Sequence, residues 1–377
     1  MFAYLDHAAT TSVCPEAARS AMEEMTAGFG NPSARYAFGQ DAARRLEEHR
    51  SVLADALGCT PEEVTFLSCG TEGDNWAIQA ALEHGRRRGK HIITTAIEHS
   101  AVLEPLKALE GKGYSVTRLK PGRDGRVSLE DLRAALREDT VLVSMMLVNN
   151  ELGTIQPVAQ CARIVKEYSP DILFHTDAVQ GFLKVPFTVD ELGVDLLTLS
   201  GHKIRAPKGI GAQYIRRGLK LSPLLRGGGQ ERTLRPGTEP TAQIAALAAA
   251  CKVWMEHGQE YRAHMDALRT YTLETLPARV EGLEIVSPGE APHICAVSLP
   301  GYPSEMLVRA LSDQGICVSS GSACHKGKPS HVFAALGLPK RTLMGVLRIS
   351  FGPGSTREEV DALADALAAI RSDRVGA

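Results

Sequence analysis

The stretch ILFHTDAVQGFLKVPFTVDELGVDLLTLSGHKIRAPKGIGAQYI, residues 172–215, is the part of the sequence that predicts the fold most directly. Three short apolar runs stand in it, at 172–175, 195–199 and 209–215, each bounded by Gly, Asp or Pro. Short apolar runs between turn residues are typical of strands buried inside a sheet. Polar residues directly follow the first two runs. The ends of strands are the positions at which α/β proteins bind their ligands.

The same alternation extends toward the N-terminus, from about residue 40. Residues 41–57 carry apolar side chains near helical spacing and predict an amphipathic helix. By the same criteria we predict helices over 72–83, 100–109, 128 onward and 158–167, and strands over 64–67, 91–95, 115–119 and 140–148. Strands and helices in alternation predict an α/β fold with a mostly parallel, seven-stranded sheet covered by helices.

The last third of the chain predicts a smaller α+β unit. An Ala-rich helix over 243–255 leads into it, and Gly258 allows a bend there. The unit itself is expected to contain a strand over 293–299, a helix over 304–314, a Gly/Ser-rich loop over 319–330, a strand over 346–350 and a helix over 356–370. We therefore expect a large domain of residues 15–257 and a small domain of residues 1–14 together with 258–377.

The composition is that of a globular enzyme, with 377 residues, 44% of them hydrophobic and 23% charged. A formal net charge of −2 gives no general attraction to nucleic acid or to an anionic membrane. The N-terminus lacks the pattern of a signal peptide, so we expect a cytoplasmic protein without direct nucleic-acid or membrane partners. The eight cysteines contain no CxxC pair, so we expect neither disulfides nor a metal site.

Polar residues cluster directly after five of the predicted strands. In an open parallel sheet these positions meet at one edge, where ligands bind. The five polar segments are 68–72, 97–100, 149–151, 176–180 and 200–203. Any one of them alone would more often be structural, as a helix cap or a solvated turn. Their convergence on one edge is what indicates a working site.

Two of these segments suit a phosphate group. Gly70 and Thr71 open a predicted helix, whose first N–H groups and dipole favour an anion. Ser200 and His202 could add hydrogen-bond donors to the same anion.

Three other residues suit an aldehyde cofactor with a pyridine ring. Lys203 follows a strand in a turn flanked by glycine, which is a suitable place for an amine that bonds a carbonyl group. Asp177 could keep a pyridine nitrogen protonated, so that the ring withdraws electrons from the substrate. His99 could lie flat over such a ring.

With these residues in view, the sequence resembles the cysteine desulfurases of the NifS/IscS type, in the class-V, fold-type I aminotransferase family. The segments that carry the resemblance extend over nearly the whole chain. They are YLDHAATT (4–11), GNPSA (30–34), GTEGDN (70–75), EHSAV (98–102), NNELGTIQP (149–157), TDAVQ (176–180), SGHKIRAPKGIG (200–211), GGGQERTLRPGT (227–238), SSGSACHKGKPSHVFAALGL (319–338) and LRISFG (347–352).

The resemblance implies pyridoxal 5′-phosphate as cofactor, L-cysteine as substrate and a homodimer. Lys203 would bond the cofactor, and His99 would stack on its ring and help to move protons. The other residues implied to contact the cofactor are Gly70, Thr71, Asn150, Asp177, Gln180, Ser200 and His202, with Thr238 reaching the phosphate from a second subunit. The residues implied to hold the substrate carboxylate are Asn31, Asn150 and Arg348. For Arg348 there is an independent reason, because a guanidinium matches a carboxylate bidentately.

The resemblance also assigns Cys324 as the nucleophile that takes sulfur from cysteine as a persulfide, leaving L-alanine. Its neighbours His325, Lys326 and Lys328 are cations of the kind that lower a thiol pKa and raise the thiolate fraction. The persulfide would pass to an acceptor protein, such as an iron–sulfur scaffold or a partner in a thiolation pathway. Cys69 and Glu239 depart from the family's pattern near the phosphate site.

Three alternatives remain open on the sequence. The Ala-Cys-His order around Cys324 also resembles selenocysteine lyases, which share this fold and cofactor. A related lyase or aminotransferase in which Cys324 is incidental is the second alternative. A non-catalytic binding protein with a degenerate site is the third, and intact Lys203, Asp177, His99 and Cys324 argue against it.

Overall fold

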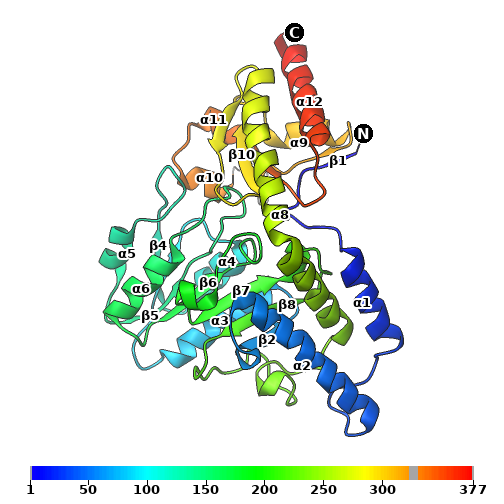
Figure 1. Cartoon of the computed structure of the whole chain (residues 1–377). Coiled ribbons are helices and arrows are strands. Elements are labelled where there is room, and N and C mark those ends of the chain that lie inside the picture. Colours follow the sequence, from blue (N-terminus) through cyan, green and yellow to red (C-terminus); the bar gives the residue numbers. More distant parts are fainter. Residues whose placement is uncertain (1, 322–329, 376–377) are drawn as a thin grey trace.

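A seven-stranded sheet forms the centre of the larger part of the molecule (Figure 1). The structure, a computed structural model, describes residues 2–321 and 330–375. In spatial order the strands are β2 (Val64–Leu67), β8 (Gly211–Ile215), β7 (Leu196–Ser200), β6 (Leu173–Asp177), β5 (Thr140–Ser144), β3 (His91–Thr95) and β4 (Ser115–Leu119). Strand β8 is antiparallel to both neighbours, and all other pairs are parallel. The predicted α/β fold with a mostly parallel sheet is confirmed.

Two strand boundaries differ from the prediction in a way that matters for the site. The strand predicted over 140–148 ends at Ser144, although the apolar residues after it stay buried. There the chain leaves the sheet while Leu147 N still donates to Asp177 O at 2.8 Å, so burial continues without regular pairing. Strand β6 extends to Asp177, which places that carboxylate as the last residue of a buried strand.

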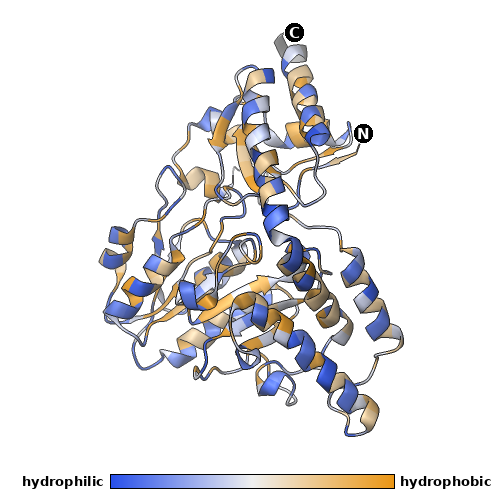
Figure 2. Ribbon diagram, in the orientation of Figure 1, coloured by the Kyte–Doolittle hydropathy of each residue, from blue (hydrophilic) through white to orange (hydrophobic). Residues whose placement is uncertain are grey.

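Both faces of the sheet are covered, as the alternation of core side chains along each strand shows. Ile92 packs into one hydrophobic cluster and Ile93 into the other, and Leu196 and Leu197 divide in the same way. Figure 2 shows the matching pattern, with hydrophobic residues on the central strands and hydrophilic ones on outward helix faces. The helices that connect the strands of this sheet are α3 (Gly70–His84), α4 (Ser100–Glu110), α5 (Leu129–Ala135), α6 (Val158–Tyr168) and α7 (Val189–Leu192).

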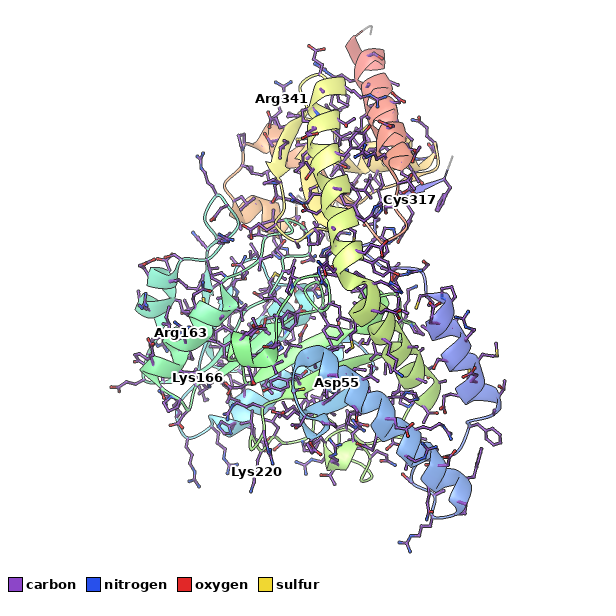
Figure 3. The ribbon with its side chains drawn as sticks, viewed as in Figure 1. Asp55, Arg163, Lys166, Lys220, Cys317 and Arg341 are labelled. Carbon is purple, nitrogen blue, oxygen red and sulfur yellow. The ribbon has the colours of Figure 1, made fainter. Side chains whose placement is uncertain are left out.

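A buried carboxylate ties the amino end of β7 to its neighbours. Asp195 is fully buried and accepts hydrogen bonds from Phe174 N at 2.7 Å, Lys166 Nζ at 2.5 Å and Arg216 Nε at 2.7 Å. Figure 3 labels Lys166 on helix α6. Two cations therefore offset one buried charge, which fixes the register of α6 against the strands.

A long helix connects the two parts of the molecule (Figure 1). Helix α8 (Thr241–Arg279) has 39 residues and is unbroken, with Gly258 buried inside it. It packs against α1 (Pro15–Thr26) and α2 (Ala37–Leu57) in the large part and against α12 (Arg357–Val375) in the small part. No helix in the two described stretches combines the length and the apolar character needed to cross a membrane.

The small part is an α+β unit that includes the N-terminal strand. Its antiparallel sheet has the order β12 (Val346–Ser350), β10 (Ile294–Ser298) and β9 (Glu284–Ser287). Strand β1 (Ala3–Tyr4) pairs in parallel with β11 (Ile316–Cys317). The remaining helices are α9 (Ser304–Ser312), α10 (His331–Ala335) and α11 (Lys340–Met344). The expected domain division at residue 257 stays a prediction, since α8 continues through that position.

Candidate active site

A cavity of about 380 Å³ lies at the carboxyl ends of the parallel strands. The residues that line it are Ala8, Ala9, Cys69, Gly70, Thr71, Asp74, His99, Met146, Val148, Asn150, Asp177, Val179, Gln180, Ser200, His202, Lys203, Ser319, Gly321 and Arg348. The five polar segments expected at the strand ends therefore meet in one place. Arg348 is added from the small part, so both parts of the molecule form the cavity.

Lys203 projects into the cavity from the turn after β7. The strand ends at Ser200, and one turn of 3-10 helix (Gly201–Lys203) carries the amine. Lys203 Nζ donates to the carbonyl oxygens of Ala8 at 2.6 Å and Ala9 at 2.7 Å. Burial and the nearby charge of Arg348 lower the pKa of Lys203 to about 8. A substantial fraction of this amine is therefore neutral near physiological pH, as a carbonyl-bonding amine needs to be.

Asp177 and Asp74 form a buried pair of carboxyl groups that lines the same cavity. Burial raises the pKa of Asp177, whereas a hydrogen bond from Val179 N and the nearby His99 and Lys203 side chains favour its ionised form. Burial and the charge of Asp177 raise the pKa of Asp74 well above its usual range. Of the two groups, Asp74 therefore holds a proton more strongly, and Asp177 is the one whose ionised form its surroundings favour.

His99 and Gln180 are both held by local hydrogen bonds. His99 is the N-cap of α4, and its Nδ1 accepts from Ala101 N at 3.2 Å, which leaves the proton on Nε2 in the neutral ring. Gln180 Nε2 donates to Ala8 O at 2.8 Å. Its Oε1 lies 3.2 Å from His293 Nε2. Neither side chain can rotate away from the cavity without losing these contacts.

The turn between β2 and α3 forms a close cradle at one end of the cavity. A Cβ added at Gly70 would lie 2.8 Å from Val179 Cγ2, so glycine allows the start of α3 to approach the segment after β6. The first N–H groups of α3 have no acceptor inside the helix. Burial lowers the pKa of His202 to about 4, so this ring is neutral, and its Nδ1 lies 3.2 Å from Thr10 Oγ1. The neutral His202 ring and the first N–H groups of α3 therefore offer hydrogen-bond donors at this end.

Arg348 approaches from the opposite side, on the central part of β12. It is 4% exposed. Its Nη1 donates to Asn150 O at 2.8 Å and its Nη2 to Asp6 Oδ1 at 2.7 Å. Its Nε, like Asn150 Oδ1, is buried and has no hydrogen-bond partner among the described residues. Arg348 Nε can therefore donate a hydrogen bond, and Asn150 Oδ1 can accept one, to or from a group that enters the cavity.

Three predicted residues are not seen in this cavity. Asn31 is exposed, and its Oδ1 accepts from Ser33 N at 2.9 Å outside the cavity. Thr238 is also exposed and does not line it. Cys324 lies outside the described residues, but Gly321, three positions before it, lines the cavity. Their roles stay predictions.

Sequence reasoning missed several contributors. The carbonyl groups of Ala8 and Ala9 carry no side-chain signal at all. Asp74 follows Thr71 by one helical turn, and that spacing could have placed it at the site. Lys184 does not line the cavity, but it is 2% exposed, and burial with the charges of Lys203 and Arg348 keeps its pKa far below the usual range. Nothing local distinguishes such a lysine from a solvated one.

The residues present fit a phosphorylated pyridine aldehyde. The glycine cradle with neutral donors suits the phosphate, the Asp177 carboxylate suits a protonated ring nitrogen, and the partly neutral Lys203 amine suits the aldehyde carbon. The cavity volume is within the range of sites for small ligands.

Comparisons with known proteins agree with this geometry. The family model described as "Aminotransferase class-V" matches residues 3–363. A relative from Methanosarcina thermophila, named "Cysteine desulfurase IscS", is 42% identical over 364 residues, which are 95% of this chain and 89% of the relative. A solved structure titled "NIFS-LIKE PROTEIN" superposes with a TM-score of 0.93 at 39% identity, covering 99% of this chain and 100% of that one. Another, titled "SspA in complex with cysteine", has a TM-score of 0.79 at 33% identity and covers 94% and 100%.

Proposed function

The chain belongs to the class-V aminotransferase family, and on that premise we propose that it is a pyridoxal-phosphate-dependent cysteine desulfurase. It converts L-cysteine to L-alanine and delivers the sulfur to a protein thiol. Relatives named cysteine desulfurase match nearly the full length of the chain, and one similar structure is titled as a complex with cysteine. The observation that carries the proposal is the meeting of the Lys203 amine and the Asp177 carboxylate in one cavity.

When bound, the cofactor supplies an electron-withdrawing ring that makes the Cα–H and C–S bonds of cysteine easier to break. The Asp177 carboxylate would accept a hydrogen bond from a protonated ring nitrogen, keep it protonated and so maintain that withdrawal. The Lys203 amine would take the Cα proton of the substrate and return it, with His99 as a second proton carrier. The lowered pKa of Lys203 suits this role, because a base works best near the operating pH.

Arg348 and Asn150 are the proposed holders of the substrate carboxylate. The Arg348 guanidinium is already oriented by Asn150 O and Asp6, so little side-chain entropy is lost when a carboxylate binds to it. The charges of Arg348 and the carboxylate would compensate each other in a site that excludes much of the water.

Cys324 is the proposed sulfur acceptor within the chain. It is three positions after Gly321 on the cavity wall, and three residues of extended chain span at most roughly 10 Å. Its sulfur would attack the sulfur of cysteine, forming the S–S bond of a persulfide while the electron pair of the broken C–S bond remains with the carbon skeleton. Protonation of that carbon gives alanine. The persulfide sulfur then passes to an acceptor protein.

A homodimer would complete the site. Thr238 is exposed, as a residue that serves a second subunit must be in the isolated chain. Exposed apolar side chains gather at the end of α1 and the start of α2, namely Met22, Met25, Phe29, Tyr36 and Phe38. The rings of Phe29 and Phe38 lie 5.0 Å apart. An apolar surface of this kind favours burial against another subunit, and the segment that contains it also carries Asn31.

The test is to incubate the cofactor-loaded protein with L-cysteine and measure alanine and sulfide. We expect one alanine for each sulfur released, and we expect the Cys324→Ala variant to lose turnover while it keeps the cofactor absorbance. Cys161→Ala is the matched control, because that thiol is buried away from the cavity and its loss leaves the chemistry in place. Equal turnover by Cys324→Ala would refute the nucleophile assignment. A strong preference for selenocysteine over cysteine would support the alternative of a selenocysteine lyase.

A further inference from the structure

The loop of residues 227–238 is anchored to the open edge of the main sheet. Strand β2 is the edge strand, and no further strand pairs with it in the described chain. On that edge Phe66 N donates to Glu231 Oε2 at 2.8 Å, and Arg50 Nη1 donates to Val64 O at 3.0 Å. Arg50 and Glu231 bind each other through two hydrogen bonds of 2.6 and 2.8 Å. The ion pair thus takes the place of a neighbouring strand.

The backbone of the loop is strained next to this anchor. Glu231, Arg232 and Thr233 are three consecutive non-glycine residues with φ of 47°, 56° and 70°. Such residues persist in the left-handed region only where their surroundings hold them. Arg50 and Glu231 are 2% and 6% exposed, so the contact that holds the loop is buried and cannot exchange for water. The loop therefore has one well-defined path.

The same loop has a second fixed point at the start of α3. Arg235 Nε donates to Glu72 Oε1 at 3.0 Å, and its Nη2 lies 3.4 Å from Oε2. Glu72 Oε2 also accepts from Ser68 N at 2.7 Å. Glu72 follows Thr71 directly, in the first turn of the helix whose N-terminus forms the cradle of the cavity. The loop thus connects the sheet edge to the proposed phosphate site.

The charge of Glu72 conflicts with the binding of a phosphate there. Burial raises the pKa of Glu72, but the hydrogen bonds from Arg235 and Ser68 outweigh burial and keep the pKa below its usual value. The carboxylate is therefore ionised at neutral pH. A negative group one residue from Thr71 would repel a phosphate dianion unless a cation offset it. His202 is neutral, so it does not offset this charge.

We propose that Arg235 is a positioning residue for the cofactor phosphate. By pairing with Glu72 it cancels the charge beside the Gly70–Thr71 turn and orients that turn, while the Arg50–Glu231 pair holds the loop that carries Arg235. The inference depends on the proposed function for the identity of the ligand, but the resemblance to the family gives Arg235 and Glu72 no role in the site.

The experiment measures the binding of inorganic phosphate and of pyridoxal phosphate to the full chain after removal of its cofactor, by titration calorimetry. Arg235→Gln is expected to weaken the binding of both by about ten-fold, the size of one lost charge-assisted contact. Arg232→Gln is the matched control. It removes a cation from the same loop, one that pairs with Glu47 at 2.9 Å on the surface, and it should leave both affinities unchanged.

A second variant separates charge cancellation from a merely structural role. In the double variant Arg235→Gln/Glu72→Gln the offending carboxylate is gone, so phosphate affinity should return to within a few-fold of wild type. A double variant as weak as Arg235→Gln would overturn the proposal, as would an Arg235→Gln protein that binds phosphate normally. If the wild-type chain bound neither ligand, the proposed function itself would fail, which is a distinguishable result.

Discussion

At the scale of single residues, the site depends on groups whose ionisation is set by burial. Burial shifts Lys203, Asp74 and His202 toward their neutral forms. It also raises the pKa of Asp177, but a hydrogen bond from Val179 N and the nearby Lys203 oppose that shift. The sequence could indicate which residue types converge, since they follow predicted strands. It could not indicate which of two carboxyl groups holds a proton, because that depends on contacts between segments about 100 residues apart.

The lowered pKa of Lys203 predicts how fast this amine reacts at different pH values. In the cofactor-free protein, brief acylation followed by peptide mass analysis should show modification of Lys203 rising with a midpoint at about pH 8. The reason is that only the neutral amine reacts, and burial and Arg348 disfavour the charged form. Lys220, exposed on the surface, serves as the reference for reagent decay in the same sample. A midpoint near the ordinary lysine value of about 10.4 would contradict the account.

Thr233 is the residue where backbone strain should be measurable. It is exposed and β-branched, and its φ is 70°, a conformation that glycine adopts without a steric penalty. We expect Thr233→Gly to increase the free energy of unfolding by about 0.5–1 kcal/mol, the difference between relieved strain and added chain entropy. Denaturant titration checks this. Thr233→Ala keeps a Cβ and should give much less of the gain; an equal gain would mean that φ is not the cause.

At the scale of elements, the site is made by strand ends and helix starts that approach each other closely. The sequence predicted all seven strands of the main sheet, because buried runs such as 64–67 and 91–95 are short and sharply bounded. It did not predict helix α1, whose buried face consists of little more than Ala17 and Glu24. That helix is stabilised mainly by packing against α8, which local patterns do not reveal.

The contact between α3 and the segment after β6 gives a prediction for Gly70. In Gly70→Ala the new Cβ would lie 2.8 Å from Val179 Cγ2, so either the Val179 side chain or the start of α3 must shift. We expect cofactor affinity to fall by about ten-fold and stability by about 1–3 kcal/mol, as for other overpacked sites. Gly354→Ala, where an added Cβ meets no atom within 4 Å, is the control. Unchanged cofactor affinity in Gly70→Ala would show that this approach does not matter for binding.

At the scale of the whole molecule, the cavity unites segments from both ends of the chain. Ala8 and Ala9 accept from Lys203, and Arg348 enters from β12. The parallel pairing of β1 with β11 joins residues more than 300 positions apart and brings the N-terminal segment there. Pairing over such a distance has no local signature, so the role of the N-terminal carbonyl groups could not be predicted. The fold class and most of the polar cluster could be, because both depend on local alternation.

The central claim is that Lys203 is the amine that bonds the cofactor, and the chain offers a demanding comparison. Lys184 is also buried with a strongly lowered pKa, but it does not line the cavity. Borohydride reduction of the cofactor-loaded protein, followed by proteolysis and mass spectrometry, would identify the modified lysine. The account predicts one cofactor-bearing peptide per chain, with the cofactor on Lys203. A cofactor found on Lys184, or on no lysine at all, would contradict it.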